Sequence, residues 1–258
     1  MTQIVFIEGV SGVGKSTTAG KLADDLRAHG YRVRSYLEFD LNPIDFYCTA
    51  YLTTSEYQQL CETFAESAAR IREYTIDAGK ARLVRYYDGD TPLFTEPLLG
   101  ILREHEFCWN PKNPVSLADY TEAYFEVWKS YADGLDTSLD FIIFDGSLLH
   151  HPINDMMRNY QVSGEDAAKH VRTLLEALGN IPKAVFYLKT DDIAAQLRRA
   201  HIDRAENPPT DTDIHFWETR YQNDMYVIGA IDMPCTVLNV SNSEWDAARE
   251  RILNMLLS

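Results

Sequence analysis

A glycine-rich stretch near the start of the chain, GVSGVGKS over residues 9–16, carries the clearest chemistry in the sequence. Its three glycines allow the backbone to turn and to bring its N–H groups around phosphate oxygens. Lys15 adds a mobile positive charge, and Ser16 offers a hydroxyl to Mg²⁺, with Thr17 beside it as a second hydroxyl. The pattern predicts a loop that binds Mg²⁺-nucleotide through Gly9, Val10, Ser11, Gly12, Val13, Gly14, Lys15, Ser16 and Thr17.

Three carboxylates follow predicted strands and could complete such a site. Asp145 ends the apolar run FIIFD, in a position where a carboxylate helps to hold Mg²⁺ together with Ser16. Glu38 and Asp40 lie at the end of the run YLEFD, where either could accept a proton from an attacking hydroxyl. Because side chains two apart along a strand point to one side, the sequence leaves both open as the catalytic base.

An arginine-bearing segment, QLRRAHIDRAENPPTD, runs from a predicted helix into a proline-containing loop. A segment of this kind can close over a triphosphate, and its guanidinium groups would then offset the charge that develops during phosphoryl transfer. A solvated helix face is the alternative. We therefore expect Arg199 and Arg204 to act in catalysis together with Lys15.

Apolar runs rich in β-branched and aromatic residues predict the strands that must position these groups. They are Ile4–Ile7, Val33–Leu37, Phe141–Phe144, Ala184–Leu188 and Thr236–Val240. Apolar residues at helical spacing predict helices over Lys15–His29, Gly164–Gly179, Asp191–Ala205, His215–Ile231 and Ser243–Leu257. The last helix would begin with Ser243 as its N-cap. The alternation predicts an α/β fold with a doubly wound, mainly parallel five-stranded sheet.

A long segment separates the second and third predicted strands, far longer than a crossover needs. We therefore expect a single domain, residues 1–258, with an insertion over 46–135. Periodic Leu, Phe, Tyr, Trp and Ala over Ser55–Ala78 and Leu117–Leu135 predict that the insertion is largely helical. Because it leaves from the carboxyl end of a strand, where open parallel sheets bind ligands, it would form an acceptor pocket or a cover over one.

Polar and aromatic side chains in and after the insertion could bind a planar or sugar-like acceptor by stacking and hydrogen bonding. His150 and His151 follow the third predicted strand, so one of them could be a base or a substrate ligand, the alternative being an ordinary loop histidine. The candidate acceptor-binding residues are Arg82, Arg85, Tyr86, Arg103, His105 and His150.

The composition limits the classes of partner. A formal net charge of -15 disfavours nucleic acid, which needs a broad basic surface, but is compatible with a small anionic ligand. No apolar run approaches the ~20 residues that span a bilayer, and the N-terminus lacks the basic flank of a signal peptide. We expect a cytoplasmic protein with a small-molecule acceptor and no membrane or nucleic-acid partner. A homodimer is an open alternative, and the four scattered cysteines indicate free thiols.

The stretch FIEGVSGVGKSTTAGKLADDLRAHGYRV resembles the opening of thymidylate kinases and deoxynucleoside kinases of the P-loop kinase superfamily, where E-G-x-x-G-x-G-K-S/T is typical. The likeness is strongest over residues 4–38 and continues more loosely through Asp145, the segment 197–209 and the late helix FWETRYQNDMY. It implies ATP as the phosphate donor, lid arginines at Arg199 and Arg204 and, from the deoxynucleoside kinases, Glu38 as the base.

Two departures from that pattern leave the acceptor open. This chain has DGSLLHHP where thymidylate kinases carry D-R-Y or D-R-F, and EFDLNP where D-R-E or E-P is usual. Small-molecule kinases of antibiotic resistance, including the tunicamycin-resistance type, share the same loop. The run YLEFDLNPIDFY resembles a bacterial group of small-molecule kinases.

The sequence therefore favours an ATP- and Mg²⁺-dependent phosphotransferase that moves the γ-phosphate of ATP to a nucleoside-, nucleotide- or antibiotic-like small molecule. The alternative is a nucleotide-hydrolysing switch that acts on a protein partner. Such a switch would need a water-positioning Gln or Glu after Asp145, where the chain has GSLL, or an N-K-x-D reader of guanine, which NVSNS does not supply.

Overall fold

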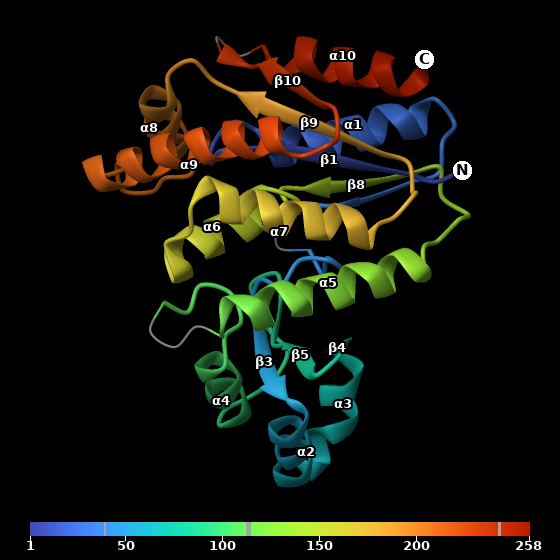
Figure 1. The fold of residues 1–258 in the computed structure, drawn as a ribbon, viewed down its shortest axis with the longest axis vertical. Helices are drawn as coiled ribbons and strands as arrows, with labels where there is room; N and C mark the ends of the chain where they lie inside the picture. Colours follow the sequence, from blue (N-terminus) through green and yellow to red (C-terminus); the bar gives the residue numbers. More distant parts are fainter. Residues whose placement is uncertain (39, 112–114, 242–243) are drawn as a thin grey trace.

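A five-stranded parallel sheet forms the centre of the molecule. The computed structural model describes residues 1–38, 40–111, 115–241 and 244–258. The sheet order is β10-β9-β1-β8-β2, and every neighbouring pair is parallel (Figure 1). These strands are β1 (Gln3–Gly9), β2 (Val33–Tyr36), β8 (Phe141–Asp145), β9 (Lys183–Lys189) and β10 (Cys235–Asn239). Each coincides with a predicted strand, so the predicted α/β fold is confirmed.

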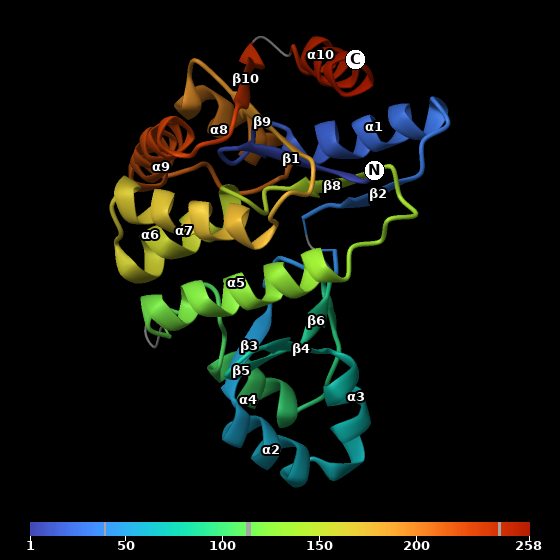
Figure 2. The ribbon, with the colours of Figure 1, turned by 45° about the vertical axis from the view of Figure 1, so that its right-hand side comes forward.

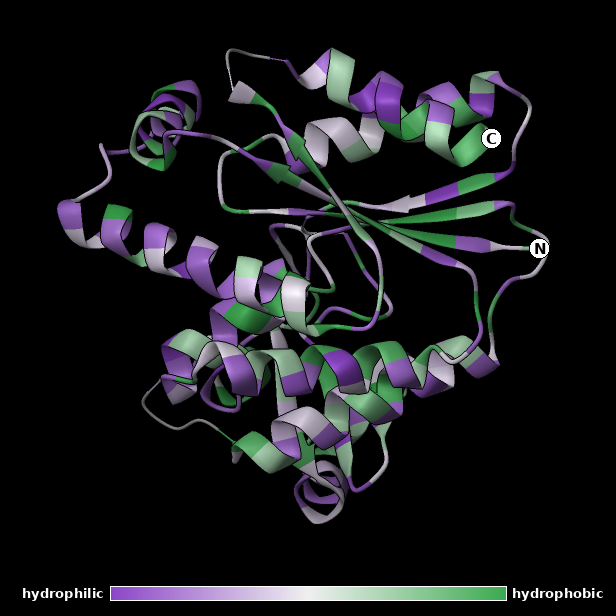
Figure 3. Ribbon diagram, turned by 45° about the horizontal axis from the view of Figure 1, so that its top comes forward, coloured by the Kyte–Doolittle hydropathy of each residue, from purple (hydrophilic) through white to green (hydrophobic). Residues whose placement is uncertain are grey.

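Helices cover both faces of this sheet. On one face α1 (Lys15–Ala28) and α10 (Trp245–Leu257) lie side by side, and on the other lie α7 (Gly164–Ala177) and α9 (Asp211–Ala230) (Figure 2). Along β1, Val5 and Ile7 belong to the core beneath α1 and α10, whereas Ile4 and Phe6 belong to the opposite core. A strand buried on both sides is a continuous apolar run, and Figure 3 shows green hydrophobic stretches along the strands of the sheet, interrupted by purple polar residues.

The helix ends follow capping residues more than hydrophobic periodicity. α1 stops as predicted, because Gly30 follows it at a φ of +88°. α9 begins four residues before the predicted start, because Thr210 caps it by accepting the Asp213 N–H. α8 (Ile193–Asp203) lies within its predicted range. The predicted N-cap Ser243 of α10 lies outside the described residues.

The helix α6 (His150–Tyr160) was not predicted from the sequence. Its buried face contains His150, Asn154 and Asp155 among its apolar residues. Its apolar residues Ile153, Met156, Met157 and Tyr160 stand at the spacing of an amphipathic helix, so the sequence contained a signal for α6 that was not used. α6 directly follows β8 and therefore begins at the carboxyl edge of the sheet.

The insertion contains helices, as predicted, and also strands. Its helices are α2 (Thr54–Thr63), α3 (Ala68–Glu73), α4 (Leu98–Glu104) and α5 (Leu117–Asp133), with a short 3-10 turn over Ala65–Ser67. Its strands β3 (Thr49–Thr53), β4 (Thr75–Ala78) and β5 (Ala81–Arg85) form an antiparallel sheet in the order β3-β5-β4, and β6 (Tyr87–Asp88) pairs with β7 (Thr91–Pro92).

The predicted helix over Ser55–Ala78 is wrong in its last residues, which form β4. Gly79, at a φ of +68°, and Lys80 make a two-residue turn, and β5 then pairs with β4. The Asp77 side chain accepts the Gly79 N–H over 2.9 Å and stabilises this turn. Pairing of β4 with β5 and of β5 with β3 therefore overrides the helical periodicity.

α5 joins the insertion to the rest of the molecule. It packs against α7 on one side and against β4 on the other, and the insertion extends beyond it, away from the central sheet (Figure 2). The far part of the insertion has a hydrophobic core of its own, which includes Leu52, Ile71 and Val84. The four cysteines are free thiols. Within the described ranges, every helix is too short or too polar to span a lipid bilayer.

Candidate functional site

The carboxyl edge of the central sheet brings the glycine-rich loop and two carboxylates together. Ile7 of β1 pairs with Asp145 of β8, so the glycine-rich loop begins just beyond Asp145. Tyr36 of β2 pairs with Phe144 of β8, which brings the end of β2 to the same edge. The Glu38 N–H donates to Asp145 Oδ2 over 3.3 Å.

The backbone of the glycine-rich loop requires glycine at three positions. Gly9, Gly12 and Gly14 have φ angles of +145°, +77° and +89°. A Cβ atom at Gly9 would lie 2.4 Å from the Leu188 carbonyl oxygen, and one at Gly12 would lie 2.7 Å from Ala200 Cβ. The loop ends at the N-terminus of α1, where unpaired N–H groups and the helix dipole favour an anion.

A cavity of about 420 Å³ lies over this loop, and we call it the loop cavity. Its walls come from the loop, from α8 and from the start of α10. Gln196 of α8 donates to the Gly12 carbonyl over 2.6 Å, and the Trp245 indole of α10 donates to the Val13 carbonyl over 2.7 Å. Arg204 lies in the lining, whereas Arg199 lies outside it, exposed on α8.

Lys15 is buried at the base of the loop cavity. Its Nζ donates to the Val10 carbonyl over 3.2 Å. Burial lowers the pKa of Lys15, and the negative charges of Asp145, Glu38 and Glu8 act in the opposite direction. A buried ammonium with carboxylates on one side is suited to bind a phosphate on the other.

Asp145 has a carboxylate oxygen that fits a cation. The residue is 2% exposed, and its Oδ1 is buried without a hydrogen-bond partner in the part of the chain that the structure describes. An unpaired buried oxygen of this kind is costly unless a cation meets it. Mg²⁺ takes few protein ligands and fills its shell with phosphate and water oxygens. Asp145 and the hydroxyl of Ser16, which lines the loop cavity, therefore fit such an ion.

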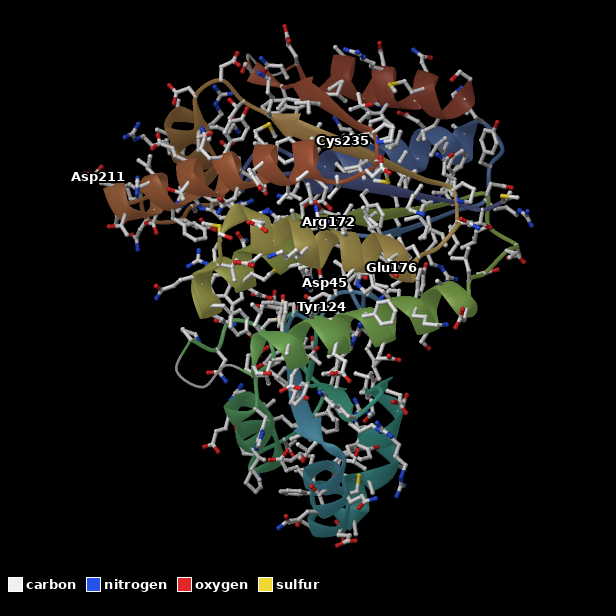
Figure 4. The ribbon with its side chains drawn as sticks, viewed as in Figure 1. Asp45, Tyr124, Arg172, Glu176, Asp211 and Cys235 are labelled. Carbon is white, nitrogen blue, oxygen red and sulfur yellow. The ribbon has the colours of Figure 1, made fainter. Side chains whose placement is uncertain are left out.

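A second cavity, of about 240 Å³, lies between the loop and the insertion, and we call it the insertion cavity. It is lined by the segment after β2, by β5 and β6, by Cys108 and Trp109 and by α6. Figure 4 shows Asp45, one of its lining residues, between α5 and the helices beneath the sheet. Ser11, Glu38 and His150 line both cavities, so the two spaces meet there.

One face of α6 forms a wall of the insertion cavity. His150, Asn154 and Arg158 follow one another at intervals of four residues, and so do His151 and Asp155. Residues four apart lie one above the other on a helix, so these five side chains share one face of α6. The wall begins at the junction of the two cavities with His150 and continues away from it to Arg158.

His150 is held in one orientation. Its main-chain N–H donates to the buried carboxylate of Glu8 over 2.9 Å, and its ring Nδ1 lies 2.9 Å from the Gly9 carbonyl oxygen. Because a carbonyl only accepts, Nδ1 carries the proton. Burial lowers the pKa of His150, so the ring is neutral and its Nε2 retains a lone pair. The ring stacks on Trp217 with centroids 5.4 Å apart.

Arg220 supports α6 from behind and lines neither cavity. It is completely buried and donates to the carbonyls of Leu149 and His150 and to the Asn154 side chain. Its charge is matched by Asp224, 2.9 Å away. The arginine in the late-helix stretch FWETRYQNDMY therefore positions the start of α6.

His151 forms a buried pair with Asp45. Its Nδ1 is hydrogen-bonded to the Asp45 carboxylate. Burial lowers the pKa of His151, but the charge and hydrogen bond of Asp45, together with the charges of Asp145 and Glu38, raise that pKa to about 9. His151 is therefore positively charged at neutral pH, and it lines the insertion cavity beside its neutral neighbour His150.

The two residues predicted as alternative bases lie in different places. Glu38 lines both cavities, whereas Asp40 lines only the insertion cavity. The Asp40 carboxylate accepts the Leu37 N–H over 2.8 Å and stabilises the turn after β2. The geometry thus separates two carboxylates that the sequence left equivalent.

Of the predicted acceptor residues, only Arg85 and His150 are part of the insertion-cavity lining. Side chains alternate along β5, so Arg85 points to the side of Leu83, toward α5, while Arg82 and Tyr86 point to the other. The other four predicted residues lie outside this lining and have other partners. Arg82 binds Asp77, Tyr86 bonds to Glu106, Arg103 pairs with Glu96, and His105 caps the end of α4.

Several lining residues were missed by the sequence analysis. Asn154, Asp155 and Arg158 belong to the unpredicted helix α6, and Asp45 lies in the segment after β2, just before the insertion. The available signal was the four-residue spacing of polar side chains in HHPINDMMR after Asp145.

No protein-family model matches the chain, and no curated protein matches its sequence. Among solved structures, the chain is similar to thymidylate kinase from Candida albicans, with 13% identity over 99% of this chain and 91% of that one, and a TM-score of 0.48. A gluconokinase from Sinorhizobium meliloti 1021 has 12% identity over 99% and 95% of the two chains, and a TM-score of 0.39.

Shikimate kinase from Bacteroides thetaiotaomicron has 11% identity over 99% of this chain and 98% of that one, and a TM-score of 0.40. All three likenesses are distant, with TM-scores below 0.5. We therefore base the function on the geometry of the chain itself.

Proposed function

We propose that the protein transfers the γ-phosphate of ATP, with Mg²⁺, to a small molecule bound in the insertion cavity. The observation that carries this proposal is the junction of two cavities at Ser11, Glu38 and His150. Transfer in line requires the donor phosphate and the acceptor in adjoining sites, held in a fixed orientation. A site that only hydrolyses a nucleotide has no need of the second cavity.

The donor side uses the groups around the loop. The loop N–H groups and Lys15 bind the phosphates, and Asp145 and Ser16 hold Mg²⁺, which neutralises charge on the phosphate oxygens. Arg204, which lines the loop cavity, offsets the charge that develops on the transferred group. Arg199 is the weaker candidate for this role, because it lies outside that lining.

The acceptor side supplies the proton acceptor. An acceptor oxygen attacks the γ-phosphorus, the bond from that phosphorus to the β,γ-bridging oxygen breaks, and ADP leaves. The hydroxyl proton passes to Glu38, which lines both cavities. His150, a neutral ring at the same junction, is the second candidate base, and Asp40 is the third.

The direct test measures ADP formation with Mg²⁺-ATP and a panel of nucleosides, nucleotides, sugars, sugar acids, aminoglycosides and other hydroxylated antibiotics. We expect ADP to form in proportion to one class of acceptor, with a phosphorylated product detectable by mass. Steady ATP hydrolysis that is indifferent to every acceptor, together with a tightly bound protein partner, would instead support a nucleotide-hydrolysing switch.

A further inference from the structure

Arg85 presents an incompletely paired positive charge to the insertion cavity. The residue is 8% exposed, and its Nε is buried with no hydrogen-bond partner among the residues that the structure describes. Its Nη2 donates to the Asp45 main-chain oxygen over 3.1 Å, not to the carboxylate. The Asp45 carboxylate bonds to His151 and to the Phe46 N–H. A buried guanidinium without a bonded carboxylate is costly until an anion meets it.

Arg158 is a second guanidinium in the same lining. Its Cζ lies 4.4 Å from the centre of the Trp109 ring, which belongs to the insertion, and 4.2 Å from the centre of the Phe216 ring, which belongs to α9. The two rings hold the guanidinium, whose N–H groups point outward in its own plane. Asp155 and Asp213 lie near enough to affect the Arg158 charge, but within the described ranges neither forms an ion pair with it.

The backbone at Trp109 supports a specific role for this arrangement. Trp109 has a φ of +55°, a conformation that is unfavourable for a bulky residue and persists only where surrounding contacts enforce it. Its ring is 56% exposed yet lies on Arg158. The strain therefore places an aromatic ring on an arginine at the rim of a cavity.

The spacing along α6 separates this end of the insertion cavity from the junction with the loop cavity. Arg158 follows His150 by eight residues, which corresponds to about 12 Å along a helix axis. The His151 and Asp45 charges compensate each other within their pair. The charged groups left to interact with a ligand are Arg85, Arg158, Asp155 and Asp40. The Asp40 carboxylate accepts the Leu37 N–H, and burial favours the neutral form of Asp155, so the two guanidinium groups remain for an anion.

We infer that the acceptor carries an anionic group, a carboxylate or a phosphate ester, which Arg85 and Arg158 bind while the oxygen that is phosphorylated lies at Glu38 and His150. This inference rests on the proposed function, since it names the class of molecule that the insertion cavity accepts. Both kinds of anion match the planar, multiply donating guanidinium group. A carboxylate and a phosphate ester differ in shape and charge, so matched probes of each kind distinguish them.

The test measures binding and not turnover. The protein is saturated with Mg²⁺ and a non-hydrolysable ATP analogue, and its melting temperature and calorimetric affinity are recorded with matched pairs of probes. The carboxylate arm compares gluconate with sorbitol and glucuronate with glucose. The phosphate arm compares thymidine monophosphate with thymidine and glucose 6-phosphate with glucose. We expect the anionic member of at least one pair to bind at least about 10-fold more tightly than its neutral partner.

Two variants connect that preference to the named residues. Arg158→Gln and Arg85→Gln should each reduce the affinity for the anionic probe by about 10-fold or more and leave the neutral probe and the ATP analogue unaffected. Arg70→Gln is the matched control, because Arg70 also lies over an aromatic ring, that of Tyr74 at 5.3 Å, but outside the cavity. Unchanged affinity for the ATP analogue shows that each variant is folded.

Equal binding of anionic and neutral members in every pair would overturn the inference, as would anion binding that Arg158→Gln and Arg85→Gln leave intact. Anion binding that is lost in both variants, in a protein that transfers no phosphate to any anion, would uphold the inference about the cavity and refute the proposed function. Failure of the inference and failure of the proposed function therefore give different results.

Discussion

The loop cavity and the insertion cavity are built from the chain in different ways. The loop cavity depends mainly on consecutive residues between β1 and α1, with α8 and α10 added around them. The insertion cavity is assembled from segments far apart in the sequence, including the turn after β2, β5, the region around Trp109, α6 and α9. A site made mainly from one segment can be predicted from spacing, whereas a site made from many segments requires the tertiary structure.

The two cavities also differ in how they carry charge. The loop cavity presents main-chain N–H groups and Lys15, which bind any polyphosphate in the same way. Both cavities contain buried ionisable side chains with displaced pKa values, but His151 and Asp155 line the insertion cavity and not the loop cavity. Displaced pKa values concentrate where a protein recognises or transforms a specific molecule. Substitutions in the loop cavity and in the insertion cavity should therefore affect activity and stability differently.

The largest effect is expected from Lys15→Ala on the donor side. The variant loses the charge that neutralises the phosphates, and we expect kcat to fall by a factor of about 10³ or more. The measurement is steady-state ADP formation, with circular dichroism to establish that the fold is retained. Lys21→Met is the matched control, because Lys21 lines the same cavity but is exposed and pairs with Asp246.

Activity of Lys15→Ala within about twofold of the wild type would mean that the glycine-rich loop does not hold the transferred phosphate. An equal loss in Lys21→Met would mean that the cavity responds to net charge and not to the position of Lys15.

The next largest effect is expected at the junction of the cavities. Glu38→Gln should reduce kcat at saturating substrate by about 10² to 10⁴, because the proton acceptor is lost while the side-chain volume is kept. Asp40→Asn is the matched variant two residues away and should reduce kcat by less than about threefold, since its amide oxygen still accepts the Leu37 N–H. Both are compared at saturating ATP and acceptor.

A larger fall in Asp40→Asn than in Glu38→Gln would reverse the assignment of the base. If both variants stay fully active, His150 becomes the proton acceptor, and the pH dependence of kcat should then change on its substitution by Gln.

A smaller effect, on stability and not on catalysis, is expected on the acceptor side at Asp155. Burial raises the pKa of Asp155 from 3.8 to about 7. An acid with a raised folded-state pKa stabilises the fold below its unfolded pKa, and that stability is lost as pH rises through the folded pKa. Between about pH 4 and 7 the wild type should lose up to about 4 kcal/mol of unfolding free energy through this group.

Asp155→Asn should flatten this part of the profile, because the amide is neutral throughout and its oxygen can still accept the Tyr120 hydroxyl, as Asp155 does over 3.2 Å. Urea unfolding of the wild type and the variant from pH 4 to 8 measures the difference. Asp166 provides a control of opposite sign, since its hydrogen bond with Ser163 lowers its pKa. Parallel profiles for wild type and Asp155→Asn would contradict the prediction.

How much of the structure can be predicted from the sequence also depends on whether a feature is built from one segment or from several. The inner strands β1 and β8 were predictable because a strand buried on both faces must be continuously apolar, as Ile4 to Ile7 are. β4 was not, because its pairing with β5 depends on a turn at Gly79 and not on periodicity. Arg85 and Arg82 look alike in the sequence, and only the strand that contains them assigns one to the cavity and the other to the outside.

The way His150 is held has a consequence for how such a protein can change its substrate. Glu8 binds its N–H, Arg220 binds its carbonyl and Gly9 binds its ring, so His150 itself is anchored by β1 and α9. From residues 46–135, Tyr120 of α5 contacts the same turn by donating to the Pro152 carbonyl over 3.5 Å, and Arg85 and Trp109 line the insertion cavity. Under the proposed function, replacing the cavity-lining part of that segment while keeping α5 would leave the anchors of His150 in place and alter the acceptor, which makes that part of the insertion an exchangeable module for evolution and for protein engineering.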